Sequence, residues 1–399
     1  MTASGSSTAR DPAAGPRRAR WAATTPFLVT GMVFASYFVR IPSLKIELGL
    51  SEGQLGLLLM LPVLSGMVAM QLTGRLVARF GSAPVVRATA VALPVSLLGF
   101  ALAGDLPRFA VVLLVLGAVD GLIDVSMNAH AVAVERALKR PVMNGCHAAW
   151  SIGAAIGSLL GGAAIKAGLS LAQHYLALTV VLVALSLVTG RHLLPASADR
   201  TGGRAAGGGR RAGWRSGWTP RVLVLGATGT VVLVCSGVVG NWSGVFLHDE
   251  LGASLATASL GYIGYNVCEA GVRLVGDRLH ERYGASALVR CCGAVAVAGL
   301  AVVVVGPVPA TAVAGFALLG LGLSVLVPVI LGAVGHDGAE SGSAGAADAL
   351  AKVGTLTYSG LLVGPMTVGW FAEAFGLTAT LGGLLVVLAV TLGLGLRRV

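Results

Sequence analysis

Long apolar stretches recur along the whole chain, and they constrain its fold more than any other feature. A membrane-spanning helix needs about 20 predominantly apolar residues to cross about 30 Å of hydrocarbon. Of the 399 residues, 55% are hydrophobic and only 11% are charged, so a soluble protein of this size could not keep its apolar surface out of water. The sequence therefore predicts an all-α polytopic membrane protein with about twelve transmembrane helices. We place these helices near residues 22–43, 54–74, 86–104, 109–134, 142–166, 171–190, 222–247, 254–277, 285–305, 309–335, 347–373 and 377–396.

The basic residues are distributed unevenly between the predicted loops. The chain carries 28 Lys and Arg against 17 Asp and Glu, which gives a net charge of +11. Nearly all of the basic residues fall in the terminal segments and in alternate loops, on one side of the predicted membrane. The exceptions are Arg40, Lys45, Arg108, Lys166 and Arg273. By the positive-inside rule we expect a multi-pass protein of the cell's cytoplasmic membrane with both termini cytoplasmic. Topology then accounts for the positive charge, and we expect no nucleic-acid partner.

Two sequence matches indicate an internal duplication. Glu47–Ser51 aligns with Glu250–Ser254, and Arg75–Gly81 aligns with Arg278–Gly284 at the same offset. A repeat at a constant offset is typical of a duplicated unit. The segment between the copies is rich in Gly, Arg, Ser and Ala, a composition typical of a flexible linker. We therefore predict a cytoplasmic tail at 1–21, a six-helix half at 22–190, a cytoplasmic linker at 191–221 and a second six-helix half at 222–399.

The second copied segment carries a recognisable motif. Gly74-Arg-Leu-Val-Ala-Arg-Phe-Gly81 resembles the signature Gly-x-Leu-Ala-Asp-Arg-x-Gly of the major facilitator superfamily (MFS), and Leu279-His-Glu-Arg-Tyr-Gly284 resembles its second-half counterpart. The resemblance implies two pseudo-symmetric halves, a substrate site between them near the bilayer midplane, and a conformational gate on the cytoplasmic side. The gate residues would be Gly74, Arg75, Arg79, Gly81, Glu281, Arg282 and Gly284. Ala78 stands where the first-half motif has its acid, so we expect an altered latch in that half.

Other stretches resemble a bacterial, sugar-permease-like branch of the same superfamily whose members are largely uncharacterised. They are Arg40-Ile-Pro42 with Leu48-Gly-Leu-Ser51, Asp124-Val-Ser-Met-Asn128, His147-Ala-Ala-Trp-Ser151, Asn241-Trp-Ser243, and Tyr358-Ser-Gly360 with Gly364-Pro365. They extend from the first predicted span to the eleventh, so the resemblance covers nearly the whole chain. Because such branches often have no established substrate, the resemblance implies a transporter without naming its cargo.

Polar residues share one face of the fourth predicted span. Asp120, Asp124 and Asn128 recur every four residues, a spacing that brings side chains together on a helix. An ionisable side chain in a span costs at least about 2.5–3.5 kcal/mol and normally faces a partner or a water-filled cavity. Two adjacent carboxylates also repel, which favours protonation of one of them. We expect a proton-coupling or substrate role for these residues and for Arg40 of the first predicted span. The alternative is a structural ion pair with Arg40 or with the arginines that follow the span.

The seventh and eighth predicted spans carry the other polar candidates. Glu269 and Arg273 stand four residues apart, so an intrahelical ion pair is available. We favour structural pairing for Arg273 and leave a coupling role open for Glu269. In the resembling branch the seventh span tends to carry acids where this chain has Ser236 and Asn241. Asp120 and Glu269 are candidates to replace those missing titratable groups.

Several other side chains are candidates to line a central cavity. They are Tyr37, His147, Trp150, Ser236, Asn241, Trp242 and Tyr358. The aromatic rings could stack on a sugar-like or planar ligand, although packing and membrane-interface positions are open alternatives. For His147 we favour a hydrogen-bonded structural role over a proton relay.

The sequence carries no motif for nucleotide hydrolysis, metal binding or nucleophilic catalysis. We therefore expect no enzyme activity, no cofactor and no metal. The favoured function is secondary active transport of a small polar organic solute (a sugar-like compound, a metabolite or a drug) by a monomer that uses protons as the coupling ion. Uptake and efflux both stay open. The alternative is a transport-dead membrane sensor or assembly partner, which the departures at Ala78, Ser236 and Asn241 favour.

Overall fold

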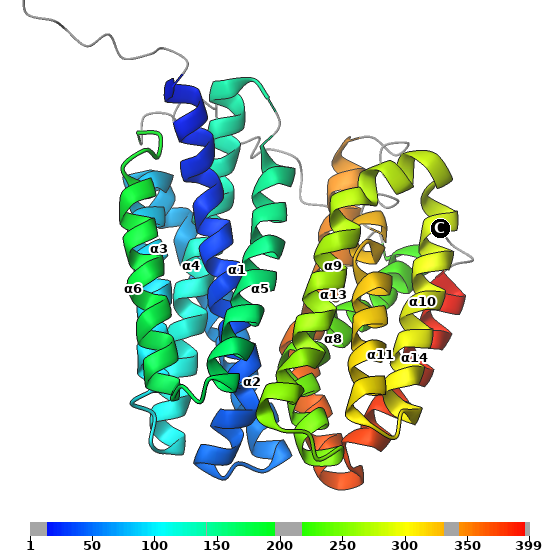
Figure 1. Cartoon of the computed structure of the whole chain (residues 1–399). Helices are drawn as coiled ribbons and strands as arrows, with labels where there is room; N and C mark the ends of the chain where they lie inside the picture. The colour runs from blue at the N-terminus through cyan, green and yellow to red at the C-terminus, as the bar shows by residue number, and fades with distance from the viewer. Residues whose placement is uncertain (1–13, 141, 196–217, 331–342, 396–399) are drawn as a thin grey trace, which may run out of the picture.

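The computed structural model describes residues 14–140, 142–195, 218–330 and 343–395, and these residues form helices and turns without a β-strand. Figure 1 shows two groups of helices side by side. The first group is α1 (Ala14–Leu48), α2 (Glu52–Phe80), α3 (Ser82–Phe100), α4 (Leu106–Leu138), α5 (Met143–Lys166) and α6 (Leu171–Gly190). The second group is α8 (Pro220–Val245), the π-helical turn η1 (Phe246–Glu250), α9 (Leu255–Tyr283), α10 (Ala285–Val305), α11 (Pro309–Leu323), α13 (Ser343–Phe375) and α14 (Leu377–Gly395).

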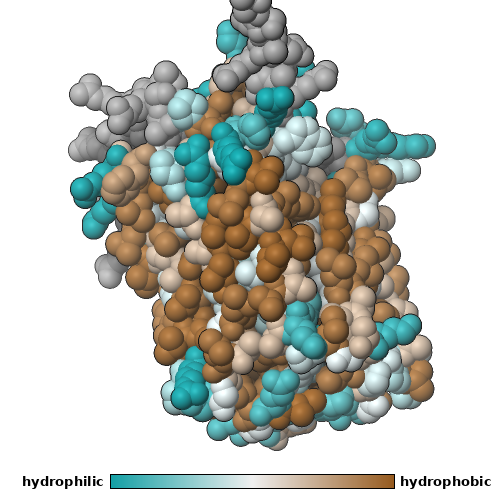
Figure 2. Space-filling view, turned by 60° about the vertical axis from the view of Figure 1, so that its left-hand side comes forward, coloured by the Kyte–Doolittle hydropathy of each residue, from teal (hydrophilic) through white to brown (hydrophobic). Residues whose placement is uncertain are grey.

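Ten helices within the described ranges are long and apolar enough to cross a membrane. The charged residues of α9, which include Glu269 and Arg273, lower its hydropathy, but both α9, with 29 residues, and α13, with 33, have the length to span a bilayer. The prediction of an all-α polytopic protein with about twelve long helices is confirmed. In Figure 2, apolar side chains form a broad band around the middle of the molecule, and hydrophilic side chains gather at its two ends.

Local sequence signals account for several helix boundaries. Ser51 and Gln54 form a reciprocal capping box that begins α2, and Ser170 and Gln173 do the same for α6. At the other boundary of α2, Gly81 has φ +86°, and Gly284 has φ +77° at the corresponding end of α9. This region of backbone conformation favours glycine. The two motif glycines therefore turn the chain directly from one long helix into the next.

Small residues let helices within each group approach closely. On α4, a Cβ at Gly117 would lie 2.0 Å from the carbonyl oxygen of Pro62, and one at Gly121 would lie 2.3 Å from that of Gly66 on α2. Gly153 of α5 faces the backbone of Leu28 on α1 in the same way. Such contacts between helix backbones are typical of membrane proteins, where van der Waals packing replaces the hydrophobic effect between helices.

We name the two ends of the molecule, because the position of the site is described relative to them. We call the end at which α2 meets α3 and α9 meets α10 the proximal end, and the end at which α1 meets α2 and α13 meets α14 the distal end. Most of the close approaches between the two groups involve the distal halves of α1, α2 and α5 with α8, α9 and α13. Toward the proximal end, at the top of Figure 1, the ribbons of the two groups diverge.

Candidate functional site

A chain of hydrogen bonds connects the two helix groups near the middle of the molecule. Arg273 of α9 donates from Nη1 to Ser151 Oγ of α5 at 3.0 Å and from Nη2 to Glu269 Oε1 at 2.9 Å. Tyr265 lies one turn before Glu269 on α9. Its hydroxyl donates to Glu269 Oε1 and lies 3.1 Å from Ser236 Oγ of α8. Ser151 lies eight residues into α5, about 12 Å from its proximal end at 1.5 Å per residue. The polar chain therefore joins α5, α9 and α8 at the depth of the apolar band.

The ion pair in this chain follows from the four-residue spacing of Glu269 and Arg273. The Glu269 side chain is only 9% exposed, whereas that of Arg273 is 38% exposed. The glutamate is thus enclosed by the protein, and the guanidinium reaches into the space between the groups. Arg273 therefore has a charged partner on its own helix and a hydroxyl partner on α5 of the other group.

Two carboxylates lie on α4 without a basic partner. Asp124 accepts a hydrogen bond from Asn128 Nδ2 at 3.2 Å, and within the described residues neither Asp120 nor Asp124 forms an ion pair. Asp120 lies deep in the molecule, yet its side chain is partly accessible to solvent. Arg40, the basic partner that we considered, instead donates to His174 and to the carbonyl oxygen of Leu169. The structural ion pair with Arg40 is therefore not formed.

His147 stands between the aspartates and the α9 network. Both Asp124 and Arg273 act on its imidazole electrostatically, and its ring packs edge-on against Phe27 at 5.3 Å. The side chain is exposed, and no hydrogen bond joins it to the described residues. Our expectation of a hydrogen-bonded structural role was therefore wrong. This exposed imidazole is acted on by charged groups of both helix groups, Asp124 of the first and Arg273 of the second.

The remaining cavity candidates differ in their placement. Trp150, Ser236 and Asn241 are partly buried. Tyr37 and Trp242 are instead among the largest fully buried side chains; Tyr37 stacks on Phe100 at 5.1 Å. Neither of these two aromatics lines open space in this conformation, contrary to our expectation, because neighbouring helices enclose them. The side chain of Tyr358 lies outside the described part of the structure.

Sequence reasoning missed Tyr265, Ser151 and Ser324 as members of the network. Ser324 accepts from Arg273 Nε through its carbonyl oxygen at 3.5 Å. For Tyr265, the signal was present in its four-residue spacing from Glu269. For Ser151 there was none, because the contact depends on how α5 and α9 pack across the two groups.

The distal end closes the space between the groups. Lys45 at the end of α1 forms an ion pair with Glu52 of α2 at 2.6 Å and a second ion pair with Asp249 of η1 in the other group. Ser51 also donates to Glu373 of α13 at 3.3 Å. Gly56 of α2 meets the backbone of α13 so closely that an added Cβ would lie 2.8 Å from the Pro365 oxygen. We call these contacts the distal seal.

The motif residues at the proximal end take part in a different arrangement. The Arg79 guanidinium lies over the ring of Phe80, and that of Arg282 lies over the ring of Tyr283, at 5.1 and 5.4 Å from the ring centroids. Arg75 and Glu281 are exposed, and a Cβ at Gly74 would meet nothing within 4 Å. Within the described ranges, none of these residues bridges the two helix groups.

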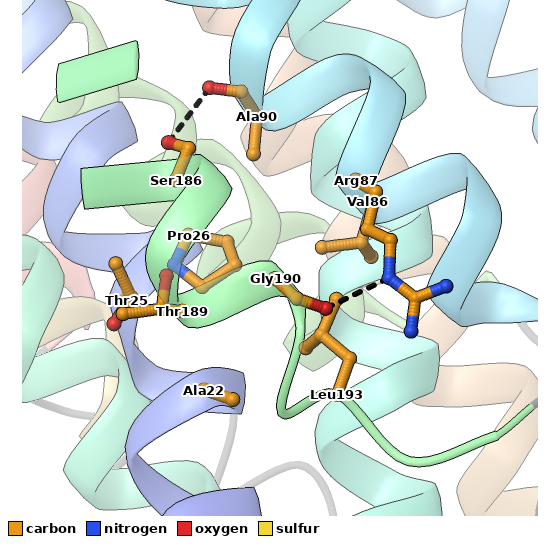
Figure 3. Close-up of a pocket in the computed structure, with 10 residues that line it drawn as sticks. All are labelled: Ala22, Thr25, Pro26, Val86, Arg87, Ala90, Ser186, Thr189, Gly190 and Leu193. Atoms are coloured by element: carbon orange, nitrogen blue, oxygen red, sulfur yellow. Dashed lines mark hydrogen bonds between the residues drawn. The ribbon is translucent and has the colours of Figure 1, made fainter. Parts of the chain in front are cut away.

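A small crevice lies within the first group, between α1, α3 and α6 (Figure 3). Arg87 donates to the carbonyl oxygen of Gly190 at 2.7 Å, and Ser186 donates to that of Ala90 at 3.0 Å, so hydrogen bonds fasten two of its walls together. No predicted site residue lines it. The crevice is therefore not part of the site between the groups.

Comparisons with known proteins agree on the architecture. A family model described as Major Facilitator Superfamily matches residues 26–350. The uncharacterised transporter y4wD of Sinorhizobium fredii is 30% identical over 363 residues, covering 87% of this chain and 89% of that protein. A crystal structure of a variant of the nucleoside transporter NupG is similar with a TM-score of 0.75 at 12% identity, covering 95% of this chain and 99% of that one. A crystal structure of a D-xylose-proton symporter gives a TM-score of 0.67 at 16% identity, with 94% and 97% covered.

Proposed function

The chain belongs to the major facilitator superfamily and is a multi-pass membrane transporter of a small molecule, not an enzyme, and from this premise we propose that it is a proton-coupled secondary carrier. The observation that carries the proposal is the polar site between the two helix groups. There Asp124 of α4 and Arg273 of α9 both act electrostatically on His147, and Arg273 is paired with Glu269. Protonation and substrate binding then act on the same space.

The proximal end is the cytoplasmic end in this proposal. The arginines near the ends of α2 (Arg75 and Arg79) and α9 (Arg278 and Arg282) lie there, in agreement with the positive-inside rule. Residues 22–190 and 222–399 are the two moving halves, joined by the cytoplasmic linker 191–221, and a monomer is the transporting unit in the cytoplasmic membrane. With the distal seal closed and the proximal halves diverging, this conformation is the inward-facing one. Opening outward then requires the distal seal to separate.

The proton moves through the carboxylates in this scheme. Asp120 or Asp124 binds a proton when the site faces one side and releases it when the site faces the other. Loss of the aspartate charge alters the electrostatic balance at His147, on which Arg273 also acts. When Glu269 takes up a second proton from the solvent between the halves, it no longer competes for the Arg273 guanidinium, which strengthens the bond from Arg273 to Ser151 of the opposite half. A proton on α9 thereby favours one relative position of the halves.

The substrate is a small polar organic molecule. Among the solved neighbours are a nucleoside transporter and a D-xylose-proton symporter, and nucleosides and xylose both carry several hydroxyl groups. The partly buried polar groups of Ser236 and Asn241 offer hydrogen bonds to such a solute, and the partly buried ring of Trp150 on the other half offers a stacking surface. Uptake and efflux are both compatible with this chemistry.

Proton flux in proteoliposomes tests the proposal. An internal pH dye is followed while nucleosides, sugars, amino acids and small drugs are added outside. We expect at least one compound to change the internal pH, and the Asp124→Asn variant to abolish that change. Asp105→Asn is the matched control, since it removes the same charge at an exposed helix cap that asparagine also satisfies.

Three outcomes distinguish the alternatives. If substrate moves without a pH change, the protein is a uniporter or uses another ion. If Asp124→Asn and Asp105→Asn behave alike, α4 does not carry the proton. If no compound of a broad panel moves, the transport-dead sensor or assembly partner is favoured, as the loss of the motif acid at Ala78 would suggest.

A further inference from the structure

Arg40 of α1 is a buried cation without a carboxylate partner. The residue is 5% exposed, and it donates from Nε to His174 Nδ1 at 3.3 Å and from Nη2 to the carbonyl oxygen of Leu169 at 2.8 Å. No carboxylate of the described residues lies within 4 Å of the guanidinium; Glu47 acts on it only from farther away. A buried charge without a counter-charge is strongly unfavourable, so this arrangement calls for an explanation.

Several buried polar groups near Arg40 have no hydrogen-bond partner within the described residues. Because His174 Nδ1 accepts from Arg40, the neutral imidazole carries its proton on Nε2. Within the described residues, this Nε2 and the hydroxyls of Tyr37, Tyr175 and Ser43 are all buried without a hydrogen-bond partner. Each such group costs about 1–3 kcal/mol if it stays unsatisfied. The cluster therefore combines a buried positive charge with an imidazole N–H and hydroxyl groups whose hydrogens are unused, and it contains no negative charge.

These donors belong to one compact cluster at the distal end of the first half. The rings of His174 and Tyr175 are 5.2 Å apart, and Phe100 packs against both Tyr37, at 5.1 Å, and Tyr175, at 6.0 Å. Tyr175 acts electrostatically on both Arg40 and Tyr37. Arg40 lies five residues before Lys45 on α1, about 7.5 Å deeper than the distal seal. The cluster is therefore near the distal surface and separate from the Arg273 network.

We propose that the cluster of Arg40, His174, Tyr37 and Tyr175 binds a small monovalent anion, such as a halide or formate, from the distal solvent. An anion is an acceptor from every direction, so one ion satisfies the guanidinium, the imidazole N–H and the phenols together. It also supplies the missing negative charge, which a water molecule does not. The site fixes α1 against α6 and the α5–α6 turn. This proposal does not rest on transport or on proton coupling, and it replaces our earlier expectation that Arg40 serves coupling or substrate binding.

Thermal unfolding of the purified full-length protein in detergent tests the proposal. The melting temperature is measured in sodium gluconate, chloride, bromide and formate at equal ionic strength. We expect a saturable rise with chloride, bromide or formate and none with gluconate, which is too large for a buried site, because an ion that binds only the folded state stabilises it. In Tyr175→Phe the half-saturating concentration should rise about tenfold, the effect of losing one hydrogen bond to a charged group. Tyr262→Phe, which changes a buried tyrosine of the second half, should leave it unchanged.

Two results would overturn the proposal. One is equal melting in gluconate and in the small anions, which would mean that water alone satisfies the cluster. The other is an equal change in anion response for Tyr175→Phe and Tyr262→Phe, which would place the anion effect elsewhere. If Tyr175→Phe does not fold, Tyr37→Phe removes a second donor of the same cluster and is read by the same criterion. Bromide anomalous diffraction gives a direct check, with a peak expected beside the Arg40 guanidinium.

Discussion

Adding one methyl group at Gly56 should open the distal seal. The Cβ of Gly56→Ala would lie 2.8 Å from the Pro365 oxygen and 2.9 Å from the Gly369 Cα. Both are backbone atoms of α13, so no side chain can rotate away, and α2 must move from α13 by about 0.5–1 Å to reach ordinary contact distance. Overpacking of this kind typically costs about 1–3 kcal/mol.

That cost falls on only one conformation, which makes the effect large. Alanine stabilises a helix by about 1 kcal/mol relative to glycine, but it does so whether the seal is closed or open. The clash exists only when the seal is closed. A differential cost of about 1–3 kcal/mol shifts the ratio of closed to open molecules by roughly 5- to 150-fold. Gly56→Ala should therefore populate the outward-open state without unfolding the protein.

Cysteine labelling measures the shift. Ser259, a buried residue of α9 that faces Gly162 of α5 across the two halves, is replaced by cysteine in a background without native cysteines. A membrane-impermeant maleimide is applied from the distal side. We expect Gly56→Ala to raise the labelling rate by a factor within the range above. Gly74→Ala on the same helix is the control, because its Cβ would meet nothing within 4 Å. Equal labelling rates in the two variants would refute the reasoning.

Three further predictions address other contacts. Asp249→Asn removes the ion pair between the halves, whose side chains are 11% and 28% exposed. It should raise the same labelling rate only about 1.4- to 5-fold, since a partly exposed pair contributes about 0.2–1 kcal/mol. No change from wild type would show that the pair does not hold the seal. Gly117→Ala puts a Cβ 2.0 Å from the Pro62 oxygen and should lower the melting temperature by several degrees. Gly383→Ala, whose Cβ would lie in open space, should not lower it. Equal melting temperatures of the two variants would contradict the close α2–α4 contact. Tyr265→Phe loses hydrogen bonds to Glu269 and Ser236. It should weaken the substrate-dependent pH signal while leaving expression and folding unchanged. An unaltered signal would show that Tyr265 does not belong to the coupling network.

The sequence was sufficient to predict features that repeat along a helix or along the chain. The apolar stretches predicted the long helices because a bilayer requires a fixed length of apolar chain. The four-residue spacing of Glu269 and Arg273 predicted an available ion pair because both residues lie on one turn of the same helix. Gly81 and Gly284 were found as motif residues before their positive φ angles gave the reason for glycine at these positions.

Contacts between different helices were not predictable in this way. Periodicity indicates which residues share a face, but not which helix that face meets. The bond between Arg273 and Ser151 and the contact of Gly56 with Gly369 both join residues far apart in the sequence. Tyr37 and Trp242 were expected to line a cavity because aromatic rings suit both ligand stacking and packing. Their burial depends on neighbours that one sequence does not identify.

The two ion pairs of Lys45 have a consequence for the speed of a transport cycle. Lys45 binds Glu52 of its own half as well as Asp249 of the other half. When the halves separate, the Lys45 ammonium stays paired with Glu52. The Asp249 carboxylate becomes exposed to water, in which it is well solvated. No charge is left buried and alone at any stage, so the barrier to parting stays low. A carrier parts and rejoins its halves for every molecule that it moves, and this ion pair adds little to the barrier of that step.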